Sequence, residues 1–231
     1  MSLLGAIVVA AGKGTRMGAK ESKQYIQLGG KPIIVHTLEA LEQASNVSEV
    51  ILVVGAQDIA MCEGLKSTYN LTKIQAIVAG GEERQSSVYE GLLRSSTEWI
   101  IVHDGVRPFV TEQLIERCWQ AAERFGGSVA AVPVKDTIKV ADQAGKVVAT
   151  PDRATLWAVQ TPQAFRRDQL LAAHEAARQD AFIGTDDASV AERYGIAVHL
   201  VTGDYNNIKI TTPDDLHWAE YQLSRDQQTR S

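Results

Sequence analysis

The sequence predicts an α/β domain in which helices cover both faces of a mainly parallel sheet, a three-layer sandwich. Short β-branched, apolar runs recur through the N-terminal half, and longer amphipathic segments separate them. A chain of 231 residues suffices for one such domain, so we expect a single domain over 1–231. Sheets of this kind bind ligands at the carboxyl ends of their strands, and a site is expected there.

The N-terminal half is expected to alternate strands with helices. The strands are predicted at 5–10, 50–54, 74–79, 99–102 and 128–132. Their near-continuous apolar character is typical of strands that are covered on both faces. The helices are predicted at 32–44, 58–69, 84–94 and 111–125. Pro32 suits a first helical turn, Thr111 is a good N-cap, and Gly126 ends the last of these helices.

Segment 133–151 interrupts this alternation of strands and helices. Two short alternating stretches flank the turn sequence Ala-Asp-Gln-Ala-Gly, which predicts a β-hairpin inserted into the domain. Its apolar residues Ile138, Val140 and Val147 alternate with polar ones, so one face needs cover, and a second copy of the chain can provide it through a twofold contact. The elements predicted after it are helices at 167–178 and 186–194, a strand at 197–201 and a closing helix at 213–223.

Composition excludes several classes of protein. The net charge of -5 argues against a nucleic-acid or anionic-membrane surface, since both require a basic face. Cys62 and Cys118 lack the spacing of a zinc site or a disulfide framework. The apolar run at 3–11 is too short to span a membrane and lacks the basic flank of a signal peptide. We therefore expect a cytoplasmic protein with neither a nucleic-acid nor a membrane partner.

A glycine-rich loop follows the first predicted strand. It reads Ala10-Ala11-Gly12-Lys13-Gly14-Thr15-Arg16-Met17-Gly18. Residues 13–23 hold four cations against the single acid Glu21: Lys13, Arg16, Lys20 and Lys23. In an acidic chain this pattern favours a polyanion site over a solvated turn, because glycines let backbone N–H groups approach phosphate closely. The dinucleotide pattern G-x-G-x-x-G fails at Met17 and the Walker pattern also fails, which disfavours a nicotinamide oxidoreductase.

Two later strand ends also carry candidate residues. After the third strand, Gly80 and Gly81 leave room for a base and Ser87 can hydrogen-bond to it, although this segment is equally a helix N-terminus. After the fourth strand come Asp104 and Arg107. This pair suits a metal, a hydroxyl or a phosphate, and it suits a structural ion pair equally well.

The loop, followed by Lys23-Gln24-Tyr25, resembles the signature of the sugar-phosphate nucleotidyltransferases. The Lys-Gln-Tyr sequence is similar to that of the 2-C-methyl-D-erythritol 4-phosphate cytidylyltransferase family. Asp152-Arg153 and segments 156–165, 184–187 and 207–211 extend the likeness over about residues 5 to 220. Val106 departs from it, because a small residue is expected there. The resemblance implies a Rossmann-like fold of the nucleotide-diphospho-sugar transferase type, with 133–151 as a dimerisation arm.

The resemblance further implies CMP transfer from CTP to methylerythritol 4-phosphate, with Mg²⁺ accompanying CTP. Arg16 and Lys23 would stabilise the transition state, and Arg153 and Lys209 would position the acceptor phosphate. The CTP-binding residues it implies are Ala10, Ala11, Gly12, Gly14, Thr15, Gly80, Gly81 and Ser87. Those it implies for the acceptor are Asp104, Arg107, Thr137 and Thr185, with Asp104 also a candidate metal ligand. Thr137 and Arg153 would complete the site of the second subunit in a homodimer.

Two alternatives remain at this stage. A ribitol-5-phosphate cytidylyltransferase shares the loop, although segment 156–165 and Thr185-Asp186-Asp187 favour the methylerythritol enzyme. A non-catalytic nucleotide-binding module is the alternative from another class. That reading leaves unexplained why cations occur at several separate strand ends.

Overall fold

The computed structural model describes residues 4–12 and 22–230. Within this part of the chain, a seven-stranded sheet has the order β11-β7-β10-β6-β1-β4-β5. Its strands are β1 (Leu4–Val9), β4 (Val47–Val54), β5 (Ile74–Ala79), β6 (Trp99–Asp104), β7 (Gly127–Pro133), β10 (Trp157–Arg166) and β11 (Val198–Thr202). β10 runs antiparallel to β6 and β7, while the other pairings are parallel. The predicted mainly parallel α/β fold is confirmed.

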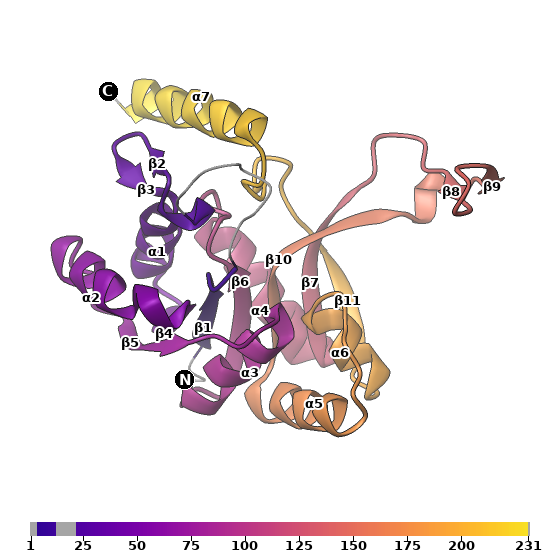
Figure 1. Ribbon diagram of the computed structural model, residues 1–231, viewed down its shortest axis with the longest axis horizontal. Helices are drawn as coiled ribbons and strands as arrows, with labels where there is room; N and C mark the ends of the chain where they lie inside the picture. The colour runs from indigo at the N-terminus through magenta and orange to yellow at the C-terminus, as the bar shows by residue number, and fades with distance from the viewer. Residues whose placement is uncertain (1–3, 13–21, 231) are drawn as a thin grey trace.

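Helices cover both faces of this sheet, as Figure 1 shows. They are α1 (Ile33–Gln43), α2 (Ile59–Thr68), α3 (Arg84–Arg94), α4 (Glu112–Phe125), α5 (Arg167–Gln179), α6 (Asp187–Arg193) and α7 (Pro213–Arg230). β1 shows how alternation builds the two layers. Ala6 and Val8 pack with residues of α1, α2 and α4, whereas Ile7 packs with residues of α3, α5 and α6. α7 is longer than predicted and lies over a small hairpin of β2 (Gln27–Leu28) and β3 (Lys31–Pro32).

The strand β10 was not predicted from the sequence. Pro162 and the polar residues Gln160, Thr161 and Gln163 argue against a central strand, because proline cannot donate to the ladder. The structure accommodates them in an irregularity: the register of β10 against β7 shifts between Val159 and Gln163. The polar side chains are thereby free to bind neighbouring loops rather than to continue a regular ladder.

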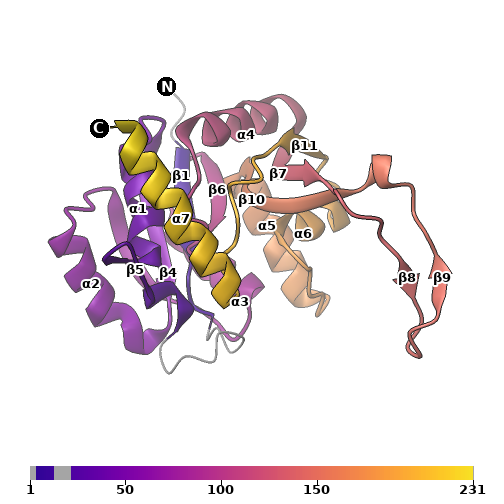
Figure 2. The same ribbon diagram turned by 90° about the horizontal axis from the view of Figure 1, so that it is seen from above.

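Segment 133–151 forms the predicted hairpin. β8 (Val140–Ala141) and β9 (Val147–Ala149) pair antiparallel near its tip, and the arm projects from the domain (Figures 1 and 2). Ile138, Val140 and Val147 are 39%, 45% and 52% exposed in the single chain. The apolar face is therefore uncovered here, and its role in dimerisation stays a prediction.

The base of the arm is tied to its own domain. The Tyr205 hydroxyl donates to the Pro133 carbonyl at 2.7 Å, and the Lys135 ammonium lies 3.7 Å from the centre of the Tyr205 ring. The Arg153 guanidinium donates to the Lys135 carbonyl at 2.7 Å. Tyr205 thus binds the start of the arm to the domain, and Arg153 joins the chain just after the arm to its start. The base of the arm is therefore fixed to its own domain. No helix in the described part of the chain has the length and apolar character to cross a membrane.

Candidate active site

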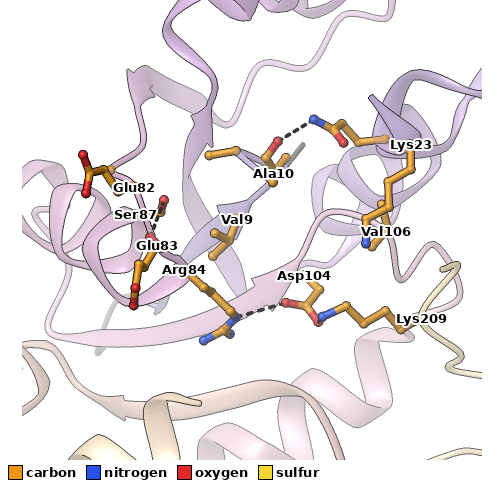
Figure 3. Close-up of a pocket in the computed structure, with 14 residues that line it drawn as sticks. Val9, Ala10, Lys23, Glu82, Glu83, Arg84, Ser87, Asp104, Val106 and Lys209 are labelled. Atoms are coloured by element: carbon orange, nitrogen blue, oxygen red, sulfur yellow. Dashed lines mark hydrogen bonds and ion pairs between the residues drawn. The ribbon is translucent and has the colours of Figure 1, made fainter. Parts of the chain in front are cut away.

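A pocket lies where the carboxyl ends of β1, β5 and β6 meet, as the topology predicts (Figure 3). Its walls come from the β1 end, the segment after it, the start of α3, the β6 end and the segment before α7. The lining residues are Val9, Ala10, Ala11, Gly12, Lys23, Gln24, Gly81, Glu82, Glu83, Arg84, Ser87, Asp104, Val106 and Lys209. Eight of these were predicted site residues: Ala10, Ala11, Gly12, Lys23, Gly81, Ser87, Asp104 and Lys209.

Lys23 is placed by its two neighbours in the short helix η2 (Lys23–Tyr25). The buried Gln24 amide donates to the Ala10 carbonyl at 2.7 Å, and Tyr25 is buried in the main hydrophobic core. These contacts explain the Lys-Gln-Tyr sequence physically, because the second and third residues anchor the first beside the β1 end. Gly14, Thr15 and Arg16 lie outside the described residues, and their predicted roles stay predictions.

The glycines after β5 allow the β1 end and α3 to approach closely. A Cβ atom on Gly80 would lie 2.5 Å from the Ala11 Cβ and 2.6 Å from the Ser87 Oγ. A side chain at position 80 would therefore push these two pocket residues apart. The Ser87 hydroxyl donates to the Glu83 carbonyl at 3.1 Å, which leaves its oxygen able to accept a hydrogen bond from a ligand.

Asp104 is the centre of a charge cluster at the end of β6. Its Oδ2 lies 2.9 Å from the Lys209 Nζ and 3.5 Å from the Arg107 Nε, and its Oδ1 lies 3.4 Å from the Arg84 Nε. Burial alone would raise the pKa of this carboxyl, but Lys209, Arg84 and Arg107 together hold the pKa well below its usual range. Asp104 is therefore an anion at neutral pH that orients cations, not a proton donor or acceptor.

Arg107 links Asp104 to the segment that precedes α7. It is buried and does not line the pocket, and its Nη1 donates to the Asn207 carbonyl at 2.8 Å. The buried Asn207 amide in turn donates to the Thr161 carbonyl at 2.8 Å. These bonds fix the segment that carries Lys209. In this structure Arg107 matches the structural ion pair that the sequence left open, and its predicted contact with the acceptor stays a prediction.

His103 and Thr161 orient the backbone of Asp104. The His103 Nε2 donates to the Arg107 carbonyl at 3.1 Å, so Nδ1 is an acceptor, and the Thr161 hydroxyl donates to it at 3.0 Å. The Thr161 oxygen accepts from the Asp104 N–H at 3.0 Å. Burial lowers the pKa of His103 to about 4, so the ring is neutral. Thr161 comes from β10, and sequence analysis missed this function because it missed the strand.

Val106, the departure from the family pattern, is a core residue that also lines the pocket. It is buried with Leu28, Ile33 and Ile210, and its carbonyl accepts from the Ile210 N–H at 3.0 Å. The larger side chain is thus accommodated by packing under α7.

The residues that the structure describes do not fit a magnesium ion held by protein ligands. Among the described residues, no group of three or more His, Cys, Asp or Glu side chains could hold a metal. Asp104, the predicted ligand, has its two oxygens covered by three cationic side chains, whose charge opposes a divalent cation.

Five predicted residues of the described chain do not line this pocket: Gly80 and Arg107, placed above, and Thr137, Arg153 and Thr185. Thr137 is exposed on the arm and Arg153 is exposed just after it, and the exposed Thr185 donates its hydroxyl to the Ser189 Oγ at 3.4 Å. The chain therefore does not bring these residues to its own pocket. Conversely, Arg84 lines the pocket and was not predicted as a site residue. The available signal was a guanidinium three residues after the two glycines that follow β5.

A mainly parallel α/β sheet with a pocket at its strand ends, lined by glycines and by the cations Lys23, Arg84 and Lys209, is typical of enzymes that handle nucleotide phosphates. Comparison with known proteins narrows the class. The family model described as 2-C-methyl-D-erythritol 4-phosphate cytidylyltransferase matches residues 4–225, and the chain belongs to this family.

Relatives and solved structures agree. The 2-C-methyl-D-erythritol 4-phosphate cytidylyltransferase of Geobacter metallireducens is 48% identical over 221 residues, 93% of this chain and 95% of the relative. That of Geobacillus kaustophilus is 48% identical over 216 residues, 93% of this chain and 94% of the relative. The crystal structure of 4-diphosphocytidyl-2C-methyl-D-erythritol synthase from Anaerococcus prevotii has a TM-score of 0.85 at 32% identity, covering 96% and 99% of the two chains. The Francisella tularensis structure has a TM-score of 0.80 at 31% identity, covering 96% and 100%.

Proposed function

We propose that this chain transfers CMP from CTP to 2-C-methyl-D-erythritol 4-phosphate, releasing pyrophosphate, as a step of isoprenoid precursor synthesis. Membership of the family supports this cytidylyltransferase activity and does not favour the ribitol-phosphate alternative. The observation that carries the proposal is the pocket itself. It joins the glycine-bearing ends of β1 and β5 to Lys23, Arg84 and Lys209 around the buried anion Asp104.

The two halves of the pocket suit the two substrates. The β1 end with Gly81 and Ser87 offers backbone N–H groups and a hydroxyl acceptor for the nucleotide. Asp104 and Lys209 offer an anion and a cation for the hydroxyl and phosphate groups of the acceptor. These assignments follow the family resemblance, and the position of the residues on opposite walls of one pocket supports them (Figure 3).

The chemistry needs no general base. The attacking acceptor phosphate oxygen is already ionised at neutral pH, so the barrier lies in bringing two polyanions together and stabilising charge on the α-phosphate. Lys23 lines the pocket and is proposed to supply such stabilisation, together with Arg16. Since Asp104 stays ionised and covered by cations, it contributes orientation without exchanging a proton.

Magnesium is proposed to enter as a counter-ion of CTP, because the described residues offer no protein cluster for it. The active form is proposed to be a cytoplasmic homodimer in which Thr137 of the arm and Arg153 just after it reach the other subunit's acceptor site. The exposed apolar face of the arm supports this arrangement, and so does the exposed Arg153, which is not among the residues that line the pocket of its own chain.

A pyrophosphate-release assay tests the function. CTP, ATP and GTP are each combined with methylerythritol 4-phosphate or ribitol 5-phosphate in the presence of Mg²⁺. We expect turnover with CTP and methylerythritol 4-phosphate. Turnover with ATP and GTP should be poor, because the closely packed Gly80 region has room for a pyrimidine base and would exclude the larger purine. Faster turnover of ribitol 5-phosphate would assign the chain to the alternative acceptor.

A further inference from the structure

The N-terminus of α3 contacts the end of β6 and the segment that leads into α6. The Arg84 Nη1 donates to the Asp187 Oδ2 at 2.7 Å, and its Nε donates to the Asp104 Oδ1 at 3.4 Å. The next residue, Gln85, accepts from the Gly184 N–H at 2.8 Å and donates to the Phe182 carbonyl at 3.0 Å. Of these two residues, Arg84 is charged and binds carboxylates, whereas Gln85 is neutral and binds backbone groups.

Asp187 is a fixed anchor for Arg84. It is 1% exposed, and its other oxygen lies 3.4 Å from the His174 Nε2 without the geometry of a hydrogen bond. Burial alone would raise the pKa of Asp187, but Arg84 and then His174 keep the pKa below its usual value. A buried carboxylate of this kind needs its cation, since removing one partner of a buried ion pair leaves an uncompensated charge and strongly destabilises the fold.

The anchor is itself held to β10. The Gln163 side chain accepts from the Ala188 N–H at 2.9 Å and donates to the Asp186 Oδ2 at 2.8 Å. The start of α6 is therefore fixed on two sides, by β10 and by α3. A guanidinium bound to such an anchor keeps its plane and position, which is the requirement for a preorganised binding group.

Part of the Arg84 guanidinium is left for a ligand. The side chain is 29% exposed and lines the pocket, and among the described residues its Nη2 has no hydrogen-bond partner. In Figure 3 the side chain extends away from Ser87 toward Asp104 and Lys209. The cluster of Arg84, Arg107, Lys209, Asp104 and Asp187 has three cations and two anions and thus a net charge of +1, and the carboxylates of Glu82 and Glu83 also line the pocket.

We propose that Arg84 is a further substrate-binding residue of the site, which donates a hydrogen bond to the phosphorylated acceptor and holds Asp104 beside it. Asp187 is its positioning residue. The acceptor, not CTP, is the substrate concerned, because Arg84 is paired with Asp104, which belongs to the acceptor half of the pocket. This inference rests on the proposed function and adds a residue to it.

Steady-state kinetics with each substrate varied in turn tests the proposal. Arg84→Gln should raise the KM for methylerythritol 4-phosphate roughly 10- to 100-fold, the range of a lost charge-assisted hydrogen bond, and leave the KM for CTP within about threefold. Arg84→Lys should recover only part of the loss, because an ammonium cannot span two carboxylates as a planar fork does. Arg94→Gln, at the exposed other end of α3, is the matched control and should behave as wild type.

Two further variants separate binding from folding. Arg84→Gln leaves Asp187 buried without its cation, so the paired change Arg84→Gln with Asp187→Asn restores a neutral contact and should melt near the wild-type temperature. Its acceptor KM should stay raised by roughly tenfold or more. Gln85→Ala removes a tie to the same loop but no charge, and should raise the acceptor KM less than about threefold.

The outcomes are distinct. A folded double variant with a wild-type acceptor KM would overturn the proposal, and so would a Gln85→Ala variant with the same effect as Arg84→Gln. A KM for CTP that rises as much as that for the acceptor would place Arg84 on the nucleotide side and also overturn it. If the wild-type enzyme does not turn over methylerythritol 4-phosphate, the proposed function itself is wrong. That result is obtained without any variant, so it is distinct from a failure of the Arg84 proposal.

Discussion

The Asp104 cluster and the 133–151 arm differ in whether their side chains find partners within one chain. The cluster collects residues from positions 84, 104, 107, 187 and 209, and its carboxylates are buried and paired with cations. The arm is continuous in sequence, and its apolar residues Val140 and Val147 are about half exposed. The cluster is complete in a single subunit, whereas the arm has the composition of a surface that a second subunit covers.

The largest effect is expected in the pocket that one subunit forms by itself. Lys23→Ala should lower kcat by about 10² or more, because Lys23 lines the pocket and is proposed to act on charge that develops in the transition state. Folding should be retained, since Gln24 and Tyr25 provide the buried contacts of this segment. Pyrophosphate release measures kcat, with Lys66→Ala on α2 as control. Near-normal turnover would remove Lys23 from the catalytic residues.

The second prediction concerns the pH dependence of folding that His103, beside the Asp104 cluster, should cause. Burial lowers the pKa of His103 to about 4, against about 6.5 in an unfolded chain, so only the unfolded state takes up this proton in between. The contribution of His103 to folding is complete above about pH 6.5 and is lost as the pH falls toward 4, by at most about 3 kcal/mol.

Urea unfolding between pH 7 and 4 measures this dependence. Asp104 and Asp187, whose pKa values are lowered on folding, should add a further loss only below about pH 4. His103→Gln removes the titrating group and should flatten the slope between pH 6.5 and 4. An unchanged slope in that variant would show that His103 is not the source.

A third prediction concerns the proposed exchange of residues between subunits. Arg153→Ala should lower activity by about tenfold or more, because a cation for the acceptor phosphate is lost. Mixing it with Lys23→Ala should restore about a quarter of wild-type activity, since half of the dimers are mixed and each mixed dimer has one intact site. Refolding the two variants together ensures exchange. No recovery in a verified mixed dimer would mean that Arg153 serves its own subunit.

The sequence predicted those parts of the molecule that local pattern determines. The strand ends near Ala10, Gly81 and Asp104 could be placed because apolar runs and glycines mark them directly. β10 could not, since Pro162 and its polar neighbours contradict a strand unless the binding partners of Gln160 and Thr161 are known. The function of Arg84 was missed for a similar reason: its partner Asp187 is 103 residues away, and only the fold brings the two together.

The smallest effect is expected from the exposed face of the arm. Changing Val140 and Val147 together to Ser should leave the unfolding free energy of one subunit within about 0.5 kcal/mol, because both side chains are exposed there. If the arm is a dimer contact, the same change removes apolar surface from the interface and should weaken association by roughly tenfold or more. Sedimentation over a concentration series measures association, and activity on dilution should fall in parallel. Lys139→Ser, a polar change on the same arm, is the control. A wild-type chain that sediments as a monomer at concentrations where it is fully active would mean that the arm serves its own subunit and that each chain carries a whole site.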